Sequence, residues 1–177
     1  MRVRTALLCL ALAAGTVLAP SAAQAGPSTS GLRPEPWRPW IQPEWTAPAG
    51  RYCDFPLGLE VVSQDVRSRV LQRHPDGSVK LEEYAGPLIS EFVNLDTGER
   101  LLSDASGSGV AEFRTDGSYV AFAMAGPVGM GFRDGDRDLT RGYYMLDGVH
   151  VVAFAADGTR SLPVDLGGED NVCDDLA

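Results

Sequence analysis

The chain has 177 residues, carries 15 basic and 24 acidic side chains, and has a formal net charge of −9. This acidic balance argues against a nucleic-acid binder, which needs a basic surface to replace the counterions of the phosphates. It argues equally against docking on anionic lipid. The length fits one domain, and 44% hydrophobic with 22% charged residues is the composition of a globular protein.

The N-terminal residues have the layout of an export signal. Arg2 and Arg4 precede an apolar run over residues 6–18, and Ala23-Gln24-Ala25 offers small residues at the two positions that a signal peptidase reads. The run is too short to span about 30 Å of hydrocarbon as a mature helix. We therefore expect a Sec-type signal peptide over residues 1–25, a secreted protein, and no membrane insertion.

Cleavage after Ala25 would leave two cysteines, Cys53 and Cys173, in an oxidising compartment. An even cysteine count there indicates a disulfide, which would close a loop of about 120 residues. A catalytic or metal-binding pair is the alternative, but neither His74 nor His150 lies at a recognisable ligand spacing from either cysteine. We expect the disulfide, no metal ion and no cofactor.

Residues 26–50 form a distinct N-terminal arm, rich in proline, that holds all three tryptophans: Trp37, Trp40 and Trp45. Proline excludes helix interiors and central strands, so the arm is expected to be extended. Three interpretations stay open: indoles packed on the domain, an exposed aromatic strip that binds peptide or glycan, and a mobile linker.

From Arg51 onward, short strand-like segments alternate with turn signals. Asp-Gly pairs favour the positive φ of tight hairpin turns, and five of them occur, at 76–77, 116–117, 134–135, 147–148 and 157–158. No apolar stripe of helical spacing runs through three turns, although residues 61–71 would also tolerate a short helix. The expected strands cover residues 59–63, 66–74, 78–84, 88–95, 100–103, 110–114, 118–125, 143–146, 149–155 and 160–164.

Eight to ten such strands in sequence predict an all-β domain over residues 51–177, built as an antiparallel meander. Such a sheet must close or split in two, because free edges invite pairing with other chains. We expect an up-and-down barrel, in which the first and last strands are neighbours and Cys53 can meet Cys173. A β-sandwich of the Greek-key type is the alternative, but it usually needs longer crossovers between its sheets, and the only long connection here is at 126–142.

The interior of such a barrel is the expected site. An eight-stranded barrel either fills with side chains or holds one small ligand. Val120, Phe122 and Met124 share a strand face and His150 lies in a neighbouring strand, so we expect these four to line a cavity for a small apolar ligand, although an ordinary filled core needs the same residues. The expected function is a monomeric, non-catalytic binding module. The alternatives are an enzyme of the cyclase or isomerase type that uses His150 or Glu91, and peptide or glycan binding by the arm.

Two further segments have weaker signals. Residues 126–133 are rich in glycine but lack the Gly-Lys-Ser/Thr ending of a phosphate loop, so a flexible connection or a lid is expected. Asp134, Asp136 and Asp138 alternate as in a calcium loop, but Leu139 stands where such a loop needs glycine. We expect a solvated charged loop there.

Several short motifs stand out between Arg51 and Ala177: Cys53-Asp54-Phe55-Pro56, Leu59-Glu60-Val61, Gly86-Pro87, Asn94-Leu95-Asp96-Thr97-Gly98, Ser106-Gly107 and Asn171-Val172-Cys173. This set, with its strong preference for arginine over lysine, resembles small secreted proteins of high-GC Gram-positive bacteria. The resemblance implies export and a paired cysteine, and it implies no particular activity. In shape, the expected meander is similar to calycin-type barrels, which include lipocalins, although the lipocalin Gly-x-Trp signature at the first strand is absent.

Overall fold

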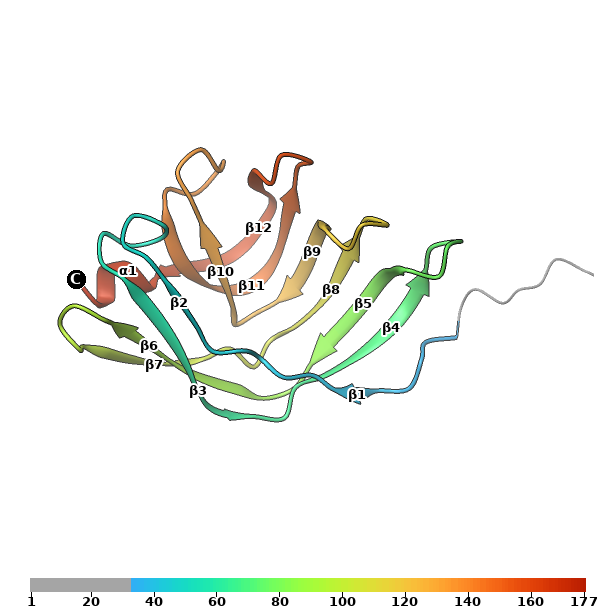
Figure 1. The fold of residues 1–177 in the computed structure, drawn as a ribbon, viewed down its shortest axis with the longest axis horizontal. Helices are drawn as coiled ribbons and strands as arrows, with labels where there is room; N and C mark the ends of the chain where they lie inside the picture. The colour runs from blue at the N-terminus through green and yellow to red at the C-terminus, as the bar shows by residue number, and fades with distance from the viewer. Residues whose placement is uncertain (1–32) are drawn as a thin grey trace, which may run out of the picture.

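The computed structural model describes residues 33–177, so the expected signal peptide and the first residues of the arm lie outside the described residues. These residues form β-strands and one helix of four residues (Figure 1). No helix among them is long and apolar enough to cross a membrane. The elements are β1 (Arg38–Pro39), β2 (Trp45–Ala47), β3 (Leu57–Gln64), β4 (Arg67–Arg73), β5 (Val79–Ala85), β6 (Leu88–Asn94), β7 (Arg100–Asp104), β8 (Ser108–Phe113), β9 (Tyr119–Ala125), β10 (Val128–Phe132), β11 (Gly142–Phe154), β12 (Arg160–Asn171) and α1 (Val172–Asp175).

The strands make two antiparallel sheets. The large sheet has the order β1-β4-β5-β8-β9-β11-β10, with β12 paired to β11, and the small sheet has the order β2-β3-β6-β7. The prediction of an all-β, antiparallel fold is thereby confirmed. Within residues 33–177 neither sheet closes on itself, so the barrel and the sandwich both remain without confirmation.

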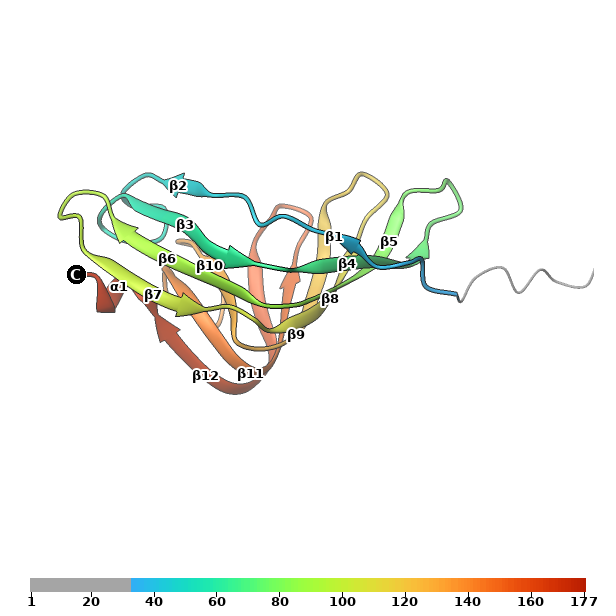
Figure 2. The ribbon, with the colours of Figure 1, turned by 90° about the horizontal axis from the view of Figure 1, so that it is seen from below.

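The chain passes between the two sheets by bending rather than by turning back. β3 continues into β4, β5 into β6 and β7 into β8 across two or three residues each, and β9 continues into β10 across two residues within the large sheet. Backbone hydrogen bonds join adjacent bends: Asp65 N donates to Pro87 O at 3.0 Å, and Gly107 N donates to Pro127 O at 2.9 Å. Strands that switch sheets in this way form a corner. Figure 2 shows β11 and β12 curling away from the layer of β3 and β4.

The hairpin turns follow the sequence signals in three places. Asp76-Gly77, Asp116-Gly117 and Asp157-Gly158 join β4 to β5, β8 to β9 and β11 to β12, and the three glycines have φ of 90°, 83° and 83°. Each aspartate carboxylate accepts a 2.9 Å bond from the backbone N–H two residues later. Side-chain bonds of this kind stabilise the turn, so these three turn predictions are confirmed.

Three expectations along the chain were wrong. Asp147-Gly148 is not a turn: it lies inside β11, which joins the two strands expected at 143–146 and 149–155. Residues 128–132 of the expected glycine-rich loop form β10, which pairs with β11. β12 runs on to Asn171, beyond the end expected at 164. In each case pairing between β11 and a neighbouring strand, β10 or β12, keeps a glycine-containing segment in an extended conformation.

The two faces of β11 contribute to two separate apolar cores. The first core lies between the sheets, and the second lies on the opposite face of β11. A disulfide joins Cys53 to Cys173 within the first core, with the Cα atoms 5.3 Å apart, which confirms the predicted pairing. The first core contains Leu57, Leu59, Phe92, Met145, Val172 and Leu176; the second contains Met124, Phe132, Tyr144, Leu146, Val152 and Leu162.

The described part of the arm, from residue 33, adds an edge strand to each sheet. β1 pairs with β4 of the large sheet, and β2 pairs with β3 of the small sheet. Trp45 packs against Tyr143, with ring centroids 5.3 Å apart. Trp37 is 39% exposed and lies 4.4 Å below the guanidinium of Arg69. The arm therefore crosses from one sheet to the other along the open side of the corner.

Candidate functional site

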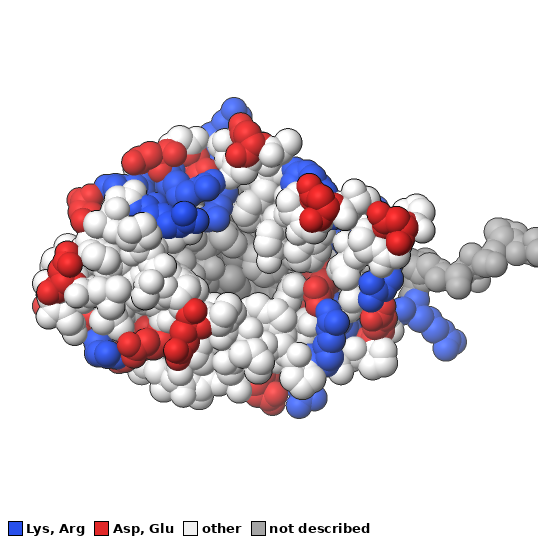
Figure 3. Space-filling view, viewed as in Figure 1, with Lys and Arg blue, Asp and Glu red and all other residues white. Residues whose placement is uncertain are grey.

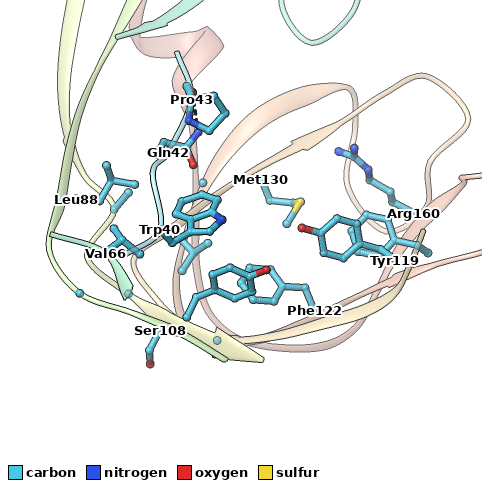
Figure 4. A pocket seen from close by; sticks show the side chains of 18 residues that line it. Trp40, Gln42, Pro43, Val66, Leu88, Ser108, Tyr119, Phe122, Met130 and Arg160 are labelled. Carbon is cyan, nitrogen blue, oxygen red and sulfur yellow. Dashed lines mark hydrogen bonds between the residues drawn. The ribbon is translucent and has the colours of Figure 1, made fainter. Parts of the chain in front are cut away.

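A cleft of about 380 Å³ lies where the arm crosses the corner between the sheets. Figure 3 shows the hollow near the centre of this face, with basic side chains gathered along its upper rim. Aromatic and aliphatic side chains make up most of its wall (Figure 4). The main side chains are Trp40, Val66, Tyr84, Leu88, Tyr119, Phe122, Val128, Met130, Phe154 and Arg160.

A partly buried polar network, centred on Glu82, lies on the arm side of the cleft. The Arg38 guanidinium donates to Glu82 Oε1 at 2.7 Å, and Tyr84 OH donates to Glu82 Oε2 at 2.9 Å. Burial, with this bond to the carboxylate, raises the pKa of Tyr84 above its ordinary value, so the phenol stays protonated. The Tyr84 ring meets the Trp40 indole edge to face, with centroids 5.5 Å apart. The network thereby fixes Trp40 over the cleft.

Replacing Arg38 by glutamine is expected to lower the free energy of unfolding by about 1–3 kcal/mol. The substitution leaves the Glu82 carboxylate, whose side chain is 9% exposed, without its cationic partner. Arg67→Gln is the matched control, since Arg67 and Asp65 form an exposed pair at 3.5 Å and the expected change is within about 0.5 kcal/mol. Urea denaturation measures both, and equal losses would contradict the anchoring role of Glu82.

The opposite side of the cleft is aromatic. The Tyr119 and Phe154 rings have centroids 5.2 Å apart. Tyr119 is 42% exposed, and partial desolvation among these side chains raises its pKa. The register between β8 and β9 skips Val120, because Phe113 pairs with Tyr119 and Glu112 with Ala121. A bulge of this kind breaks the alternation of faces. Tyr119 therefore lines the cleft in place of Val120, whereas Phe122 lines it as expected.

The other two expected cavity residues lie elsewhere. Met124 is 3% exposed and belongs to the second core, which covers this end of β9. His150 is fully buried, and its Nδ1 lies 3.3 Å from the carboxylate of Asp165 on β12. Of the four residues expected to share one cavity, the cleft contains only Phe122.

Arg160 brings positive charge to the cleft wall. Its backbone N–H donates to Asp136 Oδ1 at 2.8 Å, and its guanidinium donates to Gly131 O. The Nε atom is buried without a hydrogen-bond partner, and no carboxylate of residues 33–177 forms an ion pair with this guanidinium. Figure 4 places Arg160 across the cleft from Trp40. The guanidinium is therefore available to an anionic group.

The aspartates of the loop between β10 and β11 mainly position the backbone. Asp136 accepts from the backbone N–H groups of Arg133 and Arg160, and Asp138 Oδ2 accepts from the N–H of Leu162 at 2.7 Å. Asp136 is thus held in place by β12, whereas Asp134, Arg137 and Asp138 are exposed, as expected for a solvated charged loop. The role of Asp136 is not visible in the sequence, because an aspartate that bonds a distant strand has the same local pattern as a solvated one.

A second hollow of about 420 Å³ adjoins the cleft and shares Gly129, Met130 and Arg160 with it. Its wall includes Arg51 and Tyr52, which follow β2 in the chain. Arg160 thus lies between an aromatic space and a more polar one. An elongated ligand can occupy the first with its ring and reach the second with its charged end.

The side chains of the cleft suit binding better than proton transfer. Within the described chain no histidine, aspartate or glutamate lines it, and its tyrosines Tyr84 and Tyr119 both have raised pKa values. Glu91, the other candidate for catalysis, pairs with Arg100 in an exposed cluster that also holds Glu60. General acid–base catalysis needs a group whose pKa lies near the working pH, and the described cleft residues supply none.

Comparison with protein-family models, with curated proteins and with solved structures finds no match for this chain.

Proposed function

We propose that the protein is a secreted binding module for a small aromatic or otherwise flat apolar molecule that carries an anionic group. The cleft carries this proposal: its volume of about 380 Å³ falls within the range of small-molecule sites, which are mostly apolar with a few placed polar groups. The bent two-sheet shell supplies the enclosed apolar surface that the interior of a barrel would provide. The Cys53–Cys173 disulfide fits an extracellular location.

The charge of the ligand follows from Arg160. A protein with a net charge of −9 repels anions at long range, yet Arg160 and Arg51 face the hollows without an ion pair among residues 33–177. A carboxylate or sulfonate can accept two parallel hydrogen bonds from one guanidinium. Such a bond would also give a partner to a side chain that has a buried, unpaired Nε.

Peptide or glycan binding by the tryptophans is the weaker alternative. Trp40 lies against Tyr84 and Trp45 packs against the first core, so both indoles are partly buried, whereas Trp37 is exposed, with Arg69 above its ring. A continuous aromatic strip would need at least two neighbouring exposed rings. The packing of the arm favours a ligand beneath Trp40 over one on its outer surface.

A matched pair of probes tests the proposal. 8-Anilinonaphthalene-1-sulfonate and N-phenyl-1-naphthylamine share their rings, and only the first carries a sulfonate. We expect both to bind the untagged protein, with Arg160→Gln weakening the sulfonate by about tenfold and the neutral probe by less than about twofold, because a charge-assisted bond contributes about 1.5–3 kcal/mol. Fluorescence titration measures both affinities.

Arg67→Gln is again the control, because it removes the same charge from an exposed ion pair. A melting temperature for each variant shows whether the fold is kept. If neither probe binds the wild-type protein, or if Arg160→Gln and Arg67→Gln weaken the sulfonate equally, the proposed site is wrong.

A further inference from the structure

His150 lies in a setting that is independent of the cleft. Its side chain is fully buried on β11, and Nε2 lies 3.1 Å from the carbonyl oxygen of Asp147. A carbonyl only accepts, so Nε2 must carry the proton and donate. The other nitrogen, Nδ1, is buried with no hydrogen-bond partner. This atom points toward the neighbouring strand, β12.

Two carboxylates of β12 lie close to the His150 imidazole. The ligand atoms of His150, Asp165 and Glu169 all lie within 4.8 Å of one another. Asp165 and Glu169 are four residues apart in one strand, which in a straight strand separates their Cα atoms by about 13 Å. Their convergence therefore needs a sharply bent strand, with the carboxylates on the inside of the bend.

Gly167 leaves room for the His150 imidazole beside the two carboxylates. It lies between Asp165 and Glu169 on the same face of β12, and a Cβ on it would collide with the Asp147 carbonyl and lie 2.8 Å from His150 Nε2. The missing side chain leaves the space that the imidazole fills. Across the ladder Gly167 pairs with Gly148, so the bend has no side chain on either strand at this point.

The cluster has no cation to balance it. Within residues 33–177 neither Asp165 nor Glu169 pairs with an arginine or lysine, and an Asp165 carboxylate oxygen lies 3.3 Å from His150 Nδ1. That distance matches the separation of two ligand atoms on one tetrahedral zinc ion, about 3.3–3.5 Å for metal–ligand bonds of about 2.0–2.2 Å. An imidazole lone pair and two carboxylates this close together are a ligand set for a divalent metal.

We propose that His150 Nδ1, Asp165 and Glu169 bind one divalent transition-metal ion of the zinc type. An imidazole in the set favours zinc and its neighbours over calcium and magnesium, which prefer oxygen ligands alone. The bond from Nε2 to the Asp147 carbonyl orients the ring, as backbone carbonyls do for metal-bound histidines. The Asp165 side chain is 45% exposed, so solvent reaches the site and supplies the remaining ligand.

Zinc titration of the untagged chain by isothermal calorimetry tests this site. We expect one zinc ion per chain, no displacement by millimolar calcium, and affinities at least about tenfold weaker in Asp165→Asn and Glu169→Gln. Both substitutions are on solvent-accessible side chains, so the fold is expected to survive them. Asp170→Asn is the matched control: it removes the same charge from the adjacent residue, whose side chain points to the other face of β12.

A second measurement reports on the histidine itself. Long-range ¹H–¹⁵N NMR spectra should show a change of the His150 Nδ1 resonance on zinc addition, with Nε2 still protonated. Absence of zinc binding at 0.1 mM, equal affinity in Asp170→Asn and Asp165→Asn, or an unchanged Nδ1 resonance at saturation would each overturn the site. Probe binding in the cleft is measured separately, so failure of one proposal does not affect the other.

Discussion

The double variant Cys53→Ala, Cys173→Ala is expected to unfold with a free energy about 2–5 kcal/mol lower than that of the wild-type chain. The two cysteines are 120 residues apart in sequence, and a cross-link that closes a loop of this size removes much of the entropy of the unfolded state. Guanidinium denaturation under oxidising conditions measures the difference.

Reduction of the wild-type disulfide serves as the control for this variant. The reduced wild-type chain and the double variant should have the same midpoint, because both lose the cross-link and keep the first core. The C-terminal residues keep a further contact, since Asn94 Nδ2 donates to Leu176 O at 2.9 Å. A loss below about 0.5 kcal/mol would mean that the two ends of the domain are held together without the sulfur bridge.

The variant Phe92→Ala is expected to lose about 3–5 kcal/mol. Phe92 is 1% exposed in the core between the sheets, and its ring centroid lies 5.0 Å from that of Tyr143 on β11. Removal of a buried phenyl ring costs its transfer free energy and leaves a cavity. Urea denaturation of both proteins gives the value, with equal slopes required for a valid comparison.

Leu102→Ala is the matched control for Phe92→Ala. Leu102 lies on the neighbouring strand β7 and is 63% exposed, so its truncation should change stability by less than about 0.5 kcal/mol. If both variants lost the same free energy, the first core would not be the contact that holds the small sheet against β11.

The turns could be predicted from the sequence because their chemistry is local. An Asp-Gly pair with a serine or threonine next to it carries its own hydrogen bond, and the pairs at 76–77, 116–117 and 157–158 form hairpins for this reason. The pair Asp147-Gly148 lacks such a neighbour and lies within β11. The following residue, Val149, could have served as a signal against a turn.

The strand β10 and the bends between the sheets were not predicted from the sequence, because both depend on pairing between distant segments. β10 has the sequence Val-Gly-Met-Gly-Phe, in which large residues alternate with glycine. We assigned it to a loop from its glycine content, although the alternation itself is typical of a strand. A Cβ on Gly131 would collide with the ring of Tyr52, so glycine there is needed for close packing.

Both candidate sites depend on such long-range features. The bulge at Val120 brings Tyr119 into the cleft, and the bend at Gly167 brings Asp165 and Glu169 to His150. Period-two alternation assumes straight, regular strands, so it placed Phe122 on the face that lines the cleft but assigned no role to Tyr119. Arg160 was predicted only as the start of a strand, because its unpaired charge appears only when its neighbours in space are known.

Methionine methyl NMR tests the location of ligand binding most directly. Of the four methionines, Met130 lines the cleft, whereas Met124 and Met145 are buried in the two cores at 3% and 9% exposure. Titration of ¹³C-methyl-labelled protein with 8-anilinonaphthalene-1-sulfonate should shift the Met130 resonance most strongly through the ring current. It should shift Met124 less, since that residue lies in the core behind Phe122 and Met130, and leave Met145 nearly unchanged. A bound probe that leaves Met130 unchanged, or that shifts Met124 or Met145 most, would contradict binding in the cleft.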